Sequence, residues 1–113
     1  MEEVARAGHV VWVNDSKATN PEAAEKSLLS YGRIFWIAGG KPKPGGFRSL
    51  RPALAKVQAG YLIGTAAAEI EADLGDLVPM HRVGTLDAAV GAASAAARAA
   101  PGGEAAILLA PAC

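Results

Sequence analysis

The sequence predicts an α/β domain with a Rossmann-like, mostly parallel sheet, helices on both faces and an N-terminal antiparallel hairpin. Two observations support this fold class. Helix-forming segments alternate with short apolar runs through residues 22–110, and each apolar run is bounded by glycine or proline. Alternation of this kind is typical of parallel sheets, because a parallel connection must cross a face of the sheet and usually does so as a helix.

The first elements are a hairpin and a helix. Residues 3–6 and 9–13 flank a turn in which Gly8 supplies a positive φ, so we expect two antiparallel strands. Residues 22–30 are rich in alanine, glutamate and leucine, which favour a helix. The chain therefore begins with a hairpin and then starts its first crossover.

The middle of the chain continues the alternation. Residues 33–38 form a continuous apolar run, as expected for a strand that is covered on both faces. The prolines and glycines of residues 41–46 predict a loop. Residues 49–58 predict a helix, and residues 60–64 predict a second buried strand. The helix would bury one face, formed by Leu50, Leu54 and Val57.

The last third of the chain predicts two more helix and strand pairs. Thr65 is expected to cap an alanine-rich helix over residues 66–74, and residues 80–83 predict a short strand. A longer helix over residues 85–100 then leads to a final strand at residues 105–110.

Parallel strands with right-handed crossovers place every strand-to-helix loop at one edge of the sheet, outside the carboxyl ends of the strands, where ligands of such folds bind. We therefore expect one functional rim, and an anionic ligand on it because two of its loops carry lysines. The rim would consist of residues 15–19, 39–46, 64–65, 84–85 and 111–113.

Composition excludes several classes of function. The chain has 113 residues, the size of one domain, and its eleven basic residues balance its eleven acidic ones. A neutral chain lacks the basic surface that nucleic acid or an acidic membrane requires, and no apolar run approaches the length of a membrane span. A single cysteine, Cys113, fits a reducing cytoplasm, and two scattered histidines do not predict a metal site.

The most informative stretch is Asn14-Asp15-Ser16-Lys17-Ala18-Thr19-Asn20-Pro21, between an apolar run and a helix start. Asn20 and Pro21 are explained as the N-cap and first residue of that helix. A turn or cap does not require Asp15, Lys17 and Thr19, so these side chains are candidates for ligand binding at a position where backbone N–H groups favour anions.

Together with Ile37-Ala38-Gly39-Gly40-Lys41-Pro42-Lys43 and Leu109-Ala110-Pro111-Ala112-Cys113, this stretch resembles the C-terminal domain of the D-glutamate-adding branch of the Mur ligase family. The resemblance covers essentially the whole chain. It implies a cytoplasmic three-domain enzyme of peptidoglycan synthesis. It also implies that residues 1–113 are one domain, with the N-terminal UDP-binding and central ATPase domains absent.

The resemblance implies a reaction and a site. The family uses ATP and Mg²⁺ to activate the carboxylate of UDP-N-acetylmuramoyl-L-alanine, and the amine of D-glutamate then forms an amide. Asp15, with Asn14, would bind ATP, and Lys17 would face the reacting phosphate and carboxylate. Thr19 and Lys43 would hold the α-carboxylate of D-glutamate. This domain would contact the central domain, where ATP and Mg²⁺ are mainly bound, and would be inactive alone.

Two other interpretations stay open from the sequence: a small stand-alone module that binds an anion or nucleotide, and an inert fragment. The absence of the P-loop pattern G-x-x-x-x-G-K-[ST] argues against independent nucleotide binding. The apolar strand close to Cys113 leads us to expect a piece of a longer protein. Lys41, His9 and His81 are expected to be surface residues, whereas Trp12 and Trp36 are expected in the core.

Overall fold

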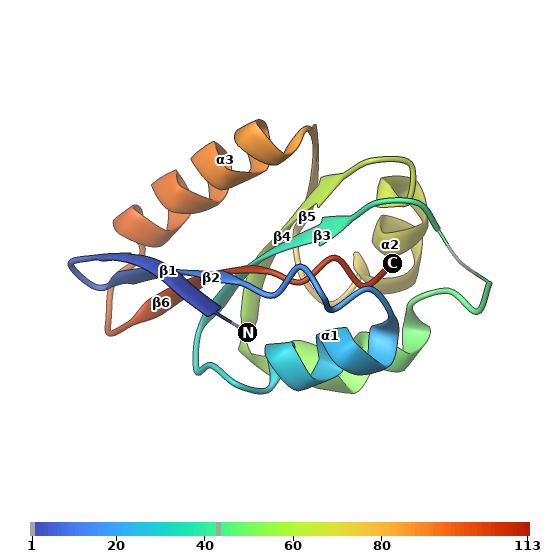
Figure 1. Ribbon diagram of the computed structural model, residues 1–113, viewed down its shortest axis with the longest axis horizontal. Helices are drawn as coiled ribbons and strands as arrows, with labels where there is room; N and C mark the ends of the chain where they lie inside the picture. Colours follow the sequence, from blue (N-terminus) through green and yellow to red (C-terminus); the bar gives the residue numbers. More distant parts are fainter. Residues whose placement is uncertain (1, 43) are drawn as a thin grey trace.

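The computed structural model describes residues 2–42 and 44–113 as one six-stranded sheet with the strand order β1-β2-β6-β3-β4-β5. β1 pairs with β2 in antiparallel fashion, and every other neighbouring pair of strands is parallel. The sheet therefore confirms the predicted fold class (Figure 1). The strands are β1 (Glu2–Ala7), β2 (Val10–Asn14), β3 (Ile34–Gly39), β4 (Val57–Ile63), β5 (Met80–Gly84) and β6 (Ala105–Leu109).

Helices cover both faces of the sheet, but unequally. α1 (Pro21–Leu28), η1 (Arg48–Lys56) and α2 (Ala67–Leu74) pack on one face, around Trp36 and Leu108. α3 (Leu86–Ala99) packs alone on the other face, against Phe35, Ile37 and Ile107 (Figure 1). Strands β3 and β6 are buried on both sides, which explains their continuous apolar sequences.

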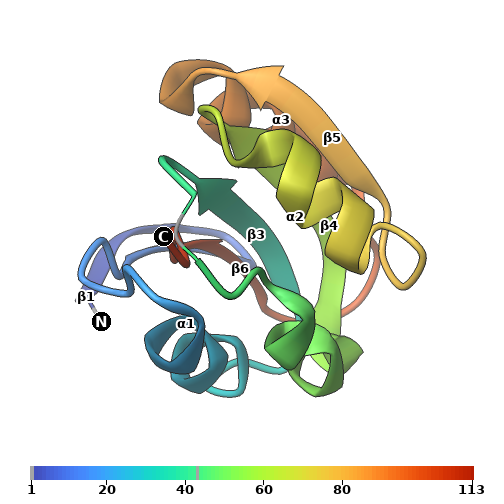
Figure 2. The same ribbon diagram turned by 90° about the vertical axis from the view of Figure 1, so that its right-hand side faces the viewer.

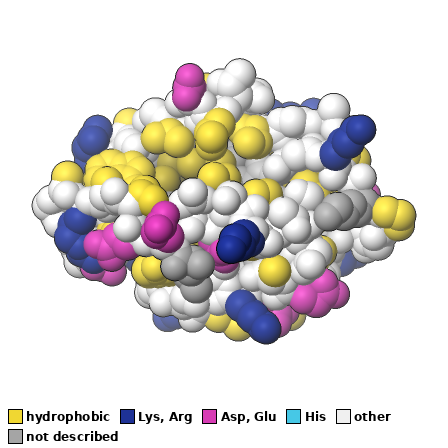
Figure 3. Space-filling view, in the orientation of Figure 1, with side chains coloured by type: hydrophobic (Ala, Val, Ile, Leu, Met, Phe, Trp, Pro, Cys, Tyr) yellow, Lys and Arg dark blue, Asp and Glu magenta, His cyan; other side chains and the backbone are white. Residues whose placement is uncertain are grey.

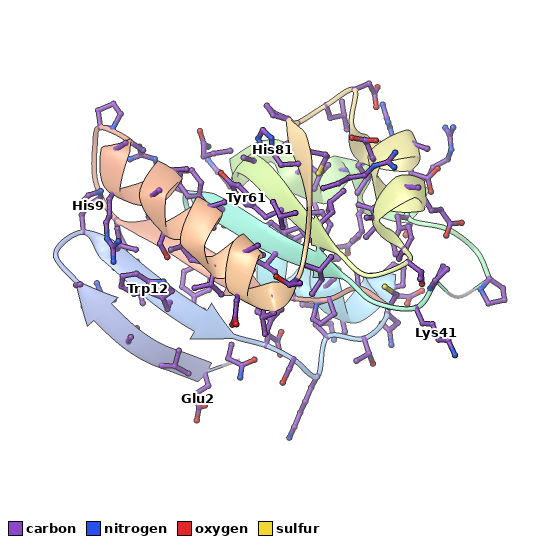
Figure 4. The ribbon with its side chains drawn as sticks, turned by 90° about the horizontal axis from the view of Figure 1, so that it is seen from above. Glu2, His9, Trp12, Lys41, Tyr61 and His81 are labelled. Atoms are coloured by element: carbon purple, nitrogen blue, oxygen red, sulfur yellow. The ribbon has the colours of Figure 1, made fainter. Side chains whose placement is uncertain are left out.

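α3 lies close to the sheet because its buried face consists of small side chains. Ala89, Ala93 and Ala97 are each fully buried against the strands. Ser94, on the same helix, accepts a hydrogen bond from Trp12 Nε1 at 3.0 Å, and Figure 4 shows Trp12 beneath α3. Trp12 is only half-buried, so the prediction of a core residue is confirmed fully for Trp36 and in part for Trp12.

One end of the α3 face is open and apolar. Val4, Leu86 and Val90 are among the most exposed large apolar side chains, and all three line one groove of about 190 Å³ beside the hairpin. Figure 3 shows this apolar patch between α3 and β1. Across residues 2–42 and 44–113, no helix has the length and apolar character that a membrane span requires.

The segment before β4 differs from the prediction. Residues 48–56 form a 3₁₀ helix, which ends two residues before the helix expected over residues 49–58, because Val57 and Gln58 already belong to β4. Pro52 lies within this segment, and in an α-helix its ring would clash with the carbonyl of Arg48. Leu50 and Leu54 are both buried, so the predicted face is confirmed for these two side chains.

The expected cap of α2 is also wrong. Ala66 occupies the N-cap position, without a side-chain cap. Thr65 instead donates a hydrogen bond from Oγ1 to the carbonyl of Gly40, at 3.2 Å. The hydroxyl therefore joins two loops at the edge of the sheet. By contrast, Thr85, expected to begin the helix over residues 85–100, is the N-cap of α3 and accepts a hydrogen bond from Ala88 N at 3.2 Å.

The predicted rim exists and is held together by backbone hydrogen bonds between consecutive loops. Figure 2 shows the strands from this edge, in their order across the sheet. The bonds are Asp15 N to Leu109 O (2.8 Å), Ala112 N to Ala18 O (2.7 Å), Gly39 N to Pro111 O (3.0 Å), Ala66 N to Gly40 O (2.9 Å) and Gly64 N to Gly84 O (3.5 Å). The five loops therefore form a connected layer.

Gly39 occupies a position on this rim that no other residue fits. Its φ is +128°, and a Cβ there would lie 2.0 Å from the carbonyl oxygen of Ile63, which is fixed backbone. We predict that Gly39→Ala lowers the free energy of unfolding by roughly 3–5 kcal/mol, from backbone strain and overpacking together.

Two matched controls separate these causes in chemical denaturation of the 113-residue chain. Gly45 has a φ of +108°, and no atom lies within 4 Å of the point that a Cβ would occupy, so Gly45→Ala should show only the backbone cost, about 1–3 kcal/mol. Gly103 is exposed with open space around it, and Gly103→Ala should change stability by less than about 0.5 kcal/mol. Equal effects at Gly39 and Gly45 would contradict the close approach to Ile63, and equal effects at Gly39 and Gly103 would contradict both causes.

Candidate functional site

The loop between β2 and α1 is fixed from both sides. Asp15 N donates to Leu109 O, and Ala18 N donates to Asp15 O at 2.9 Å, which closes a turn. Ala18 is 1% exposed, and its carbonyl accepts from Ala112 N. Because Ala18 anchors the loop in the core, Lys17 and Thr19 on either side of it are both exposed at the rim.

The two asparagines of the loop shape its backbone. Asn14 Oδ1 accepts a hydrogen bond from Ser16 N at 2.9 Å, which forms a local turn after β2. Asn20 is the N-cap of α1, its Oδ1 accepting from Ala23 N at 2.8 Å, and Pro21 is the first helical residue. The predicted helix start is therefore confirmed. α1 ends at Leu28, two residues before the predicted end, and Leu29 is exposed.

Asp15 is half-buried and is held by a residue of α1. The hydroxyl of Ser27 donates a hydrogen bond to Asp15 Oδ2, across 12 positions of sequence. Ser27 itself is 1% exposed. The carboxylate therefore has a defined orientation between the loop and the helix.

Two hollows border this loop. One, of about 470 Å³, lies against α1, and the other, of about 210 Å³, lies towards the start of β1. Asp15 and Lys17 line both hollows, and Asn14 joins them in the smaller one. Lys26 and Glu22 also line the larger hollow, so it contains two ammonium groups and two carboxylates. This arrangement offers both anion-binding and hydroxyl-binding groups, so this part of the rim is less cationic than its lysines suggested.

Not all the predicted site residues come together. Thr19 is exposed two residues from Lys17, but it is not among the described residues that line the two hollows. Lys43 lies outside the described residues. Lys41 extends outward from the loop after β3, as expected for a solvated lysine (Figure 4).

The histidines lie away from this loop. His9 is half-buried, and its Nε2 lies 3.0 Å from the carbonyl oxygen of Ala97, so the side chain joins the hairpin to α3. This differs from the prediction that His9 is a surface residue. His81 is exposed as predicted and stacks on Tyr61, with ring centroids 5.3 Å apart. Within residues 2–42 and 44–113, no group of three or more His, Cys, Asp or Glu side chains is arranged to hold a metal ion.

Comparison with known proteins identifies the family. The model of the family described as "Mur ligase, glutamate ligase domain" matches residues 1–113. The chain belongs to this family.

The curated relatives agree with this assignment. The chain is 54% identical to the UDP-N-acetylmuramoylalanine–D-glutamate ligase of Rhizobium meliloti (strain 1021), over 113 residues. It is 51% identical to the ligase of the same name from Nitrobacter winogradskyi and 50% identical to that from Agrobacterium fabrum. Each match covers 100% of this chain and 24% of the relative, so the chain spans about a quarter of the relatives' length.

Within this glutamate ligase domain, sequence reasoning missed the contribution of α1 to the site. Ser27 and Lys26 border the same hollow as Asp15 and Lys17. A signal for Ser27 was present: it follows Ala24 by three positions on the buried face of a helix, where a hydroxyl requires a partner. The sequence could not indicate which partner, because Asp15 precedes the helix.

Proposed function

We propose that this chain is the C-terminal domain of an ATP-dependent ligase that joins D-glutamate to UDP-N-acetylmuramoyl-L-alanine in the cytoplasm, during peptidoglycan synthesis. The observation that carries the proposal is the loop of residues 14–20, which presents Asp15 and Lys17 to two hollows at the carboxyl edge of the sheet. The relatives at 50–54% identity carry the name of that ligase. UDP-binding and ATPase domains would precede this domain in the full-length enzyme.

Asp15 and Asn14 are proposed to bind the ribose end of ATP. A carboxylate accepts hydrogen bonds from hydroxyl donors, and the ribose supplies two neighbouring hydroxyls. Asp15 is half-buried and oriented by Ser27, so its carboxylate is partly ordered before a ligand arrives. Asn14 lines the smaller hollow beside Asp15 and sets the turn that follows β2.

Lys17 is proposed as the catalytic residue of this domain. Lys17 lines both hollows, and its ammonium would face the phosphate and carboxylate oxygens on which negative charge develops. ATP supplies the phosphoryl group that converts the substrate carboxylate to an acyl phosphate, which the amine of D-glutamate attacks. The residues of this loop fit ATP, because Asp15 can accept hydrogen bonds from the ribose hydroxyls and Lys17 can bind a phosphate. Mg²⁺ is proposed to bind mainly on the central domain, as the resemblance to the family implies.

Thr19 and Lys43 are proposed to hold the α-carboxylate of D-glutamate. Thr19 is exposed on the same loop as Lys17, and a hydroxyl and an ammonium are both suitable donors to a carboxylate. Gly39 and Gly40, which precede the Lys43 loop, are bonded to Pro111 and Ala66, so the start of that loop is fixed on the rim.

The role of Lys17 can be tested in the full-length ligase. We predict that Lys17→Ala lowers kcat about ten- to a hundredfold, because one charge-assisted interaction of about 1.5–3 kcal/mol is lost, and leaves the KM for D-glutamate within about threefold. Lys56→Ala is the matched control, since Lys56 is an exposed lysine at the opposite edge of the sheet, just before β4. An unchanged kcat in Lys17→Ala would remove Lys17 from the chemical step.

The role of Lys43 has a control in the same loop. We predict that Lys43→Ala raises the KM for D-glutamate about ten- to a hundredfold with a smaller effect on kcat, because a carboxylate contact in the substrate complex is lost. Lys41→Ala, two positions away, should leave both constants near wild type. A Lys43→Ala enzyme with an unchanged KM for D-glutamate would contradict this assignment.

The isolated 113 residues distinguish the ligase domain from a stand-alone nucleotide-binding module. We predict that titration calorimetry at micromolar concentrations shows no binding of ATP or D-glutamate, because the other half of each site would lie on another domain. Circular dichroism of the same sample would verify that the domain is folded. Micromolar binding of ATP by this chain alone would favour the stand-alone module.

A further inference from the structure

Ser27 places a hydroxyl on the buried face of α1. It is near the end of α1 on the buried face, between Ala24 and Leu28, and is 1% exposed. Alanine would be favoured here, since serine has a lower helix propensity and a buried hydroxyl is costly without a hydrogen-bond partner. A serine is therefore tolerated at this position only because its hydroxyl has a hydrogen-bond partner.

That partner is Asp15, the candidate ATP-binding carboxylate. Ser27 Oγ donates to Asp15 Oδ2, and both residues line the larger hollow. A hydrogen bond from a buried hydroxyl to a carboxylate is charge-assisted and restricts the rotation of the carboxylate. A carboxylate has about four acceptor positions, so accepting from Ser27 does not prevent Asp15 from accepting further hydrogen bonds from a ligand.

We propose that Ser27 is a positioning residue for the ribose-binding carboxylate: through its hydrogen bond it holds Asp15 in the orientation that accepts the hydroxyl groups of ATP. The proposal rests on the proposed function, in which Asp15 binds the ribose. Ser27 itself does not contact the substrate; it acts by reducing the rotational freedom that Asp15 would otherwise lose on binding.

The chain provides a matched control in Ser94. Ser94 is also a helical serine, 6% exposed, and its hydroxyl has one defined partner, Trp12 Nε1 at 3.0 Å. It lies on α3, on the opposite face of the sheet from α1. Ser94→Ala therefore removes a comparably buried hydroxyl and its hydrogen bond without touching the loop of residues 14–20.

The experiment is a double-mutant cycle in the full-length ligase, with steady-state kinetics for ATP and D-glutamate and thermal unfolding of each variant. Ser27→Ala is expected to raise the KM for ATP about three- to tenfold and to leave the KM for D-glutamate within about twofold, as loss of one charge-assisted hydrogen bond would do. In an Asp15→Ala background, Ser27→Ala should have no further effect on the KM for ATP. Ser94→Ala should leave both constants unchanged.

The failures of this inference and of the proposed function are distinguishable. If Asp15→Ala leaves the KM for ATP unchanged, the assignment of Asp15 is wrong and the inference falls with it. If Asp15→Ala raises the KM for ATP but Ser27→Ala does not, only the positioning role is overturned. The same holds if Ser27→Ala raises this KM equally in the wild-type and Asp15→Ala backgrounds. A Ser27→Ala enzyme that is unfolded at the assay temperature, or in which all constants change together as strongly as the KM for ATP, would show a purely structural role and also overturn it.

Discussion

The candidate site depends on the insertion of β6 between β2 and β3. This strand is the last in the chain, yet it is central in the sheet. Its end and the residues after it accept or donate the hydrogen bonds that fix Asp15, Ala18 and Gly39. Trp36 strengthens this connection, since its Nε1 donates to Ala110 O at 2.9 Å in the core. The loop that carries Asp15 and Lys17 is therefore ordered by residues about 95 positions later in the chain.

This dependence divides the polar stretch of residues 14–20 into two functions. Asn14 and Asn20 satisfy backbone N–H groups, so that β2 can end and α1 can begin. Ala18 fixes the loop in the core, which leaves Lys17 and Thr19 exposed. Some polar residues of this segment thus build the loop, and we propose that others bind ligands. Two of the residues proposed to bind ligands, Lys17 and Thr19, are exposed because the buried Ala18 fixes the loop between them.

The fold could be predicted from sequence because its determinants are local. Glycines and prolines mark the ends of the strands, and the apolar runs of β3 and β6 are those of strands buried on both faces. A helix was predicted over residues 49–58 without a type, and Pro52 inside the observed segment of residues 48–56 disfavours the α-helical form. Periodicity shows which residues share a face but not whether that face is covered, and Leu29, Leu86 and Val90 are exposed in the structure.

The candidate site was less predictable than the fold, because it depends on pairs that are distant in the sequence. The resemblance to Mur ligases indicated Asp15, Lys17 and Thr19, but the contact between Asp15 and Ser27 follows only from the way α1 packs beside the loop. Conversely, the sequence suggested a cationic rim, whereas Glu22 and Asp15 balance Lys17 and Lys26 around the larger hollow. A count of lysines by loop ignores Asp15 in the same loop, and α1 adds one acidic residue and one lysine to the hollow, Glu22 and Lys26.

The different burial of Asp15 and Lys17 is consistent with different roles. Asp15 is half-buried and held by Ser27, so little order remains to be gained when it accepts a ligand. Lys17 is exposed, and an ammonium in water interacts only weakly with an anion, by about 1 kcal/mol at 4 Å. It would become an effective electrostatic catalyst only when water is removed from the hollow. We therefore propose that closure of another domain over this rim strengthens the interaction of Lys17, whereas Asp15 is already oriented in the open domain.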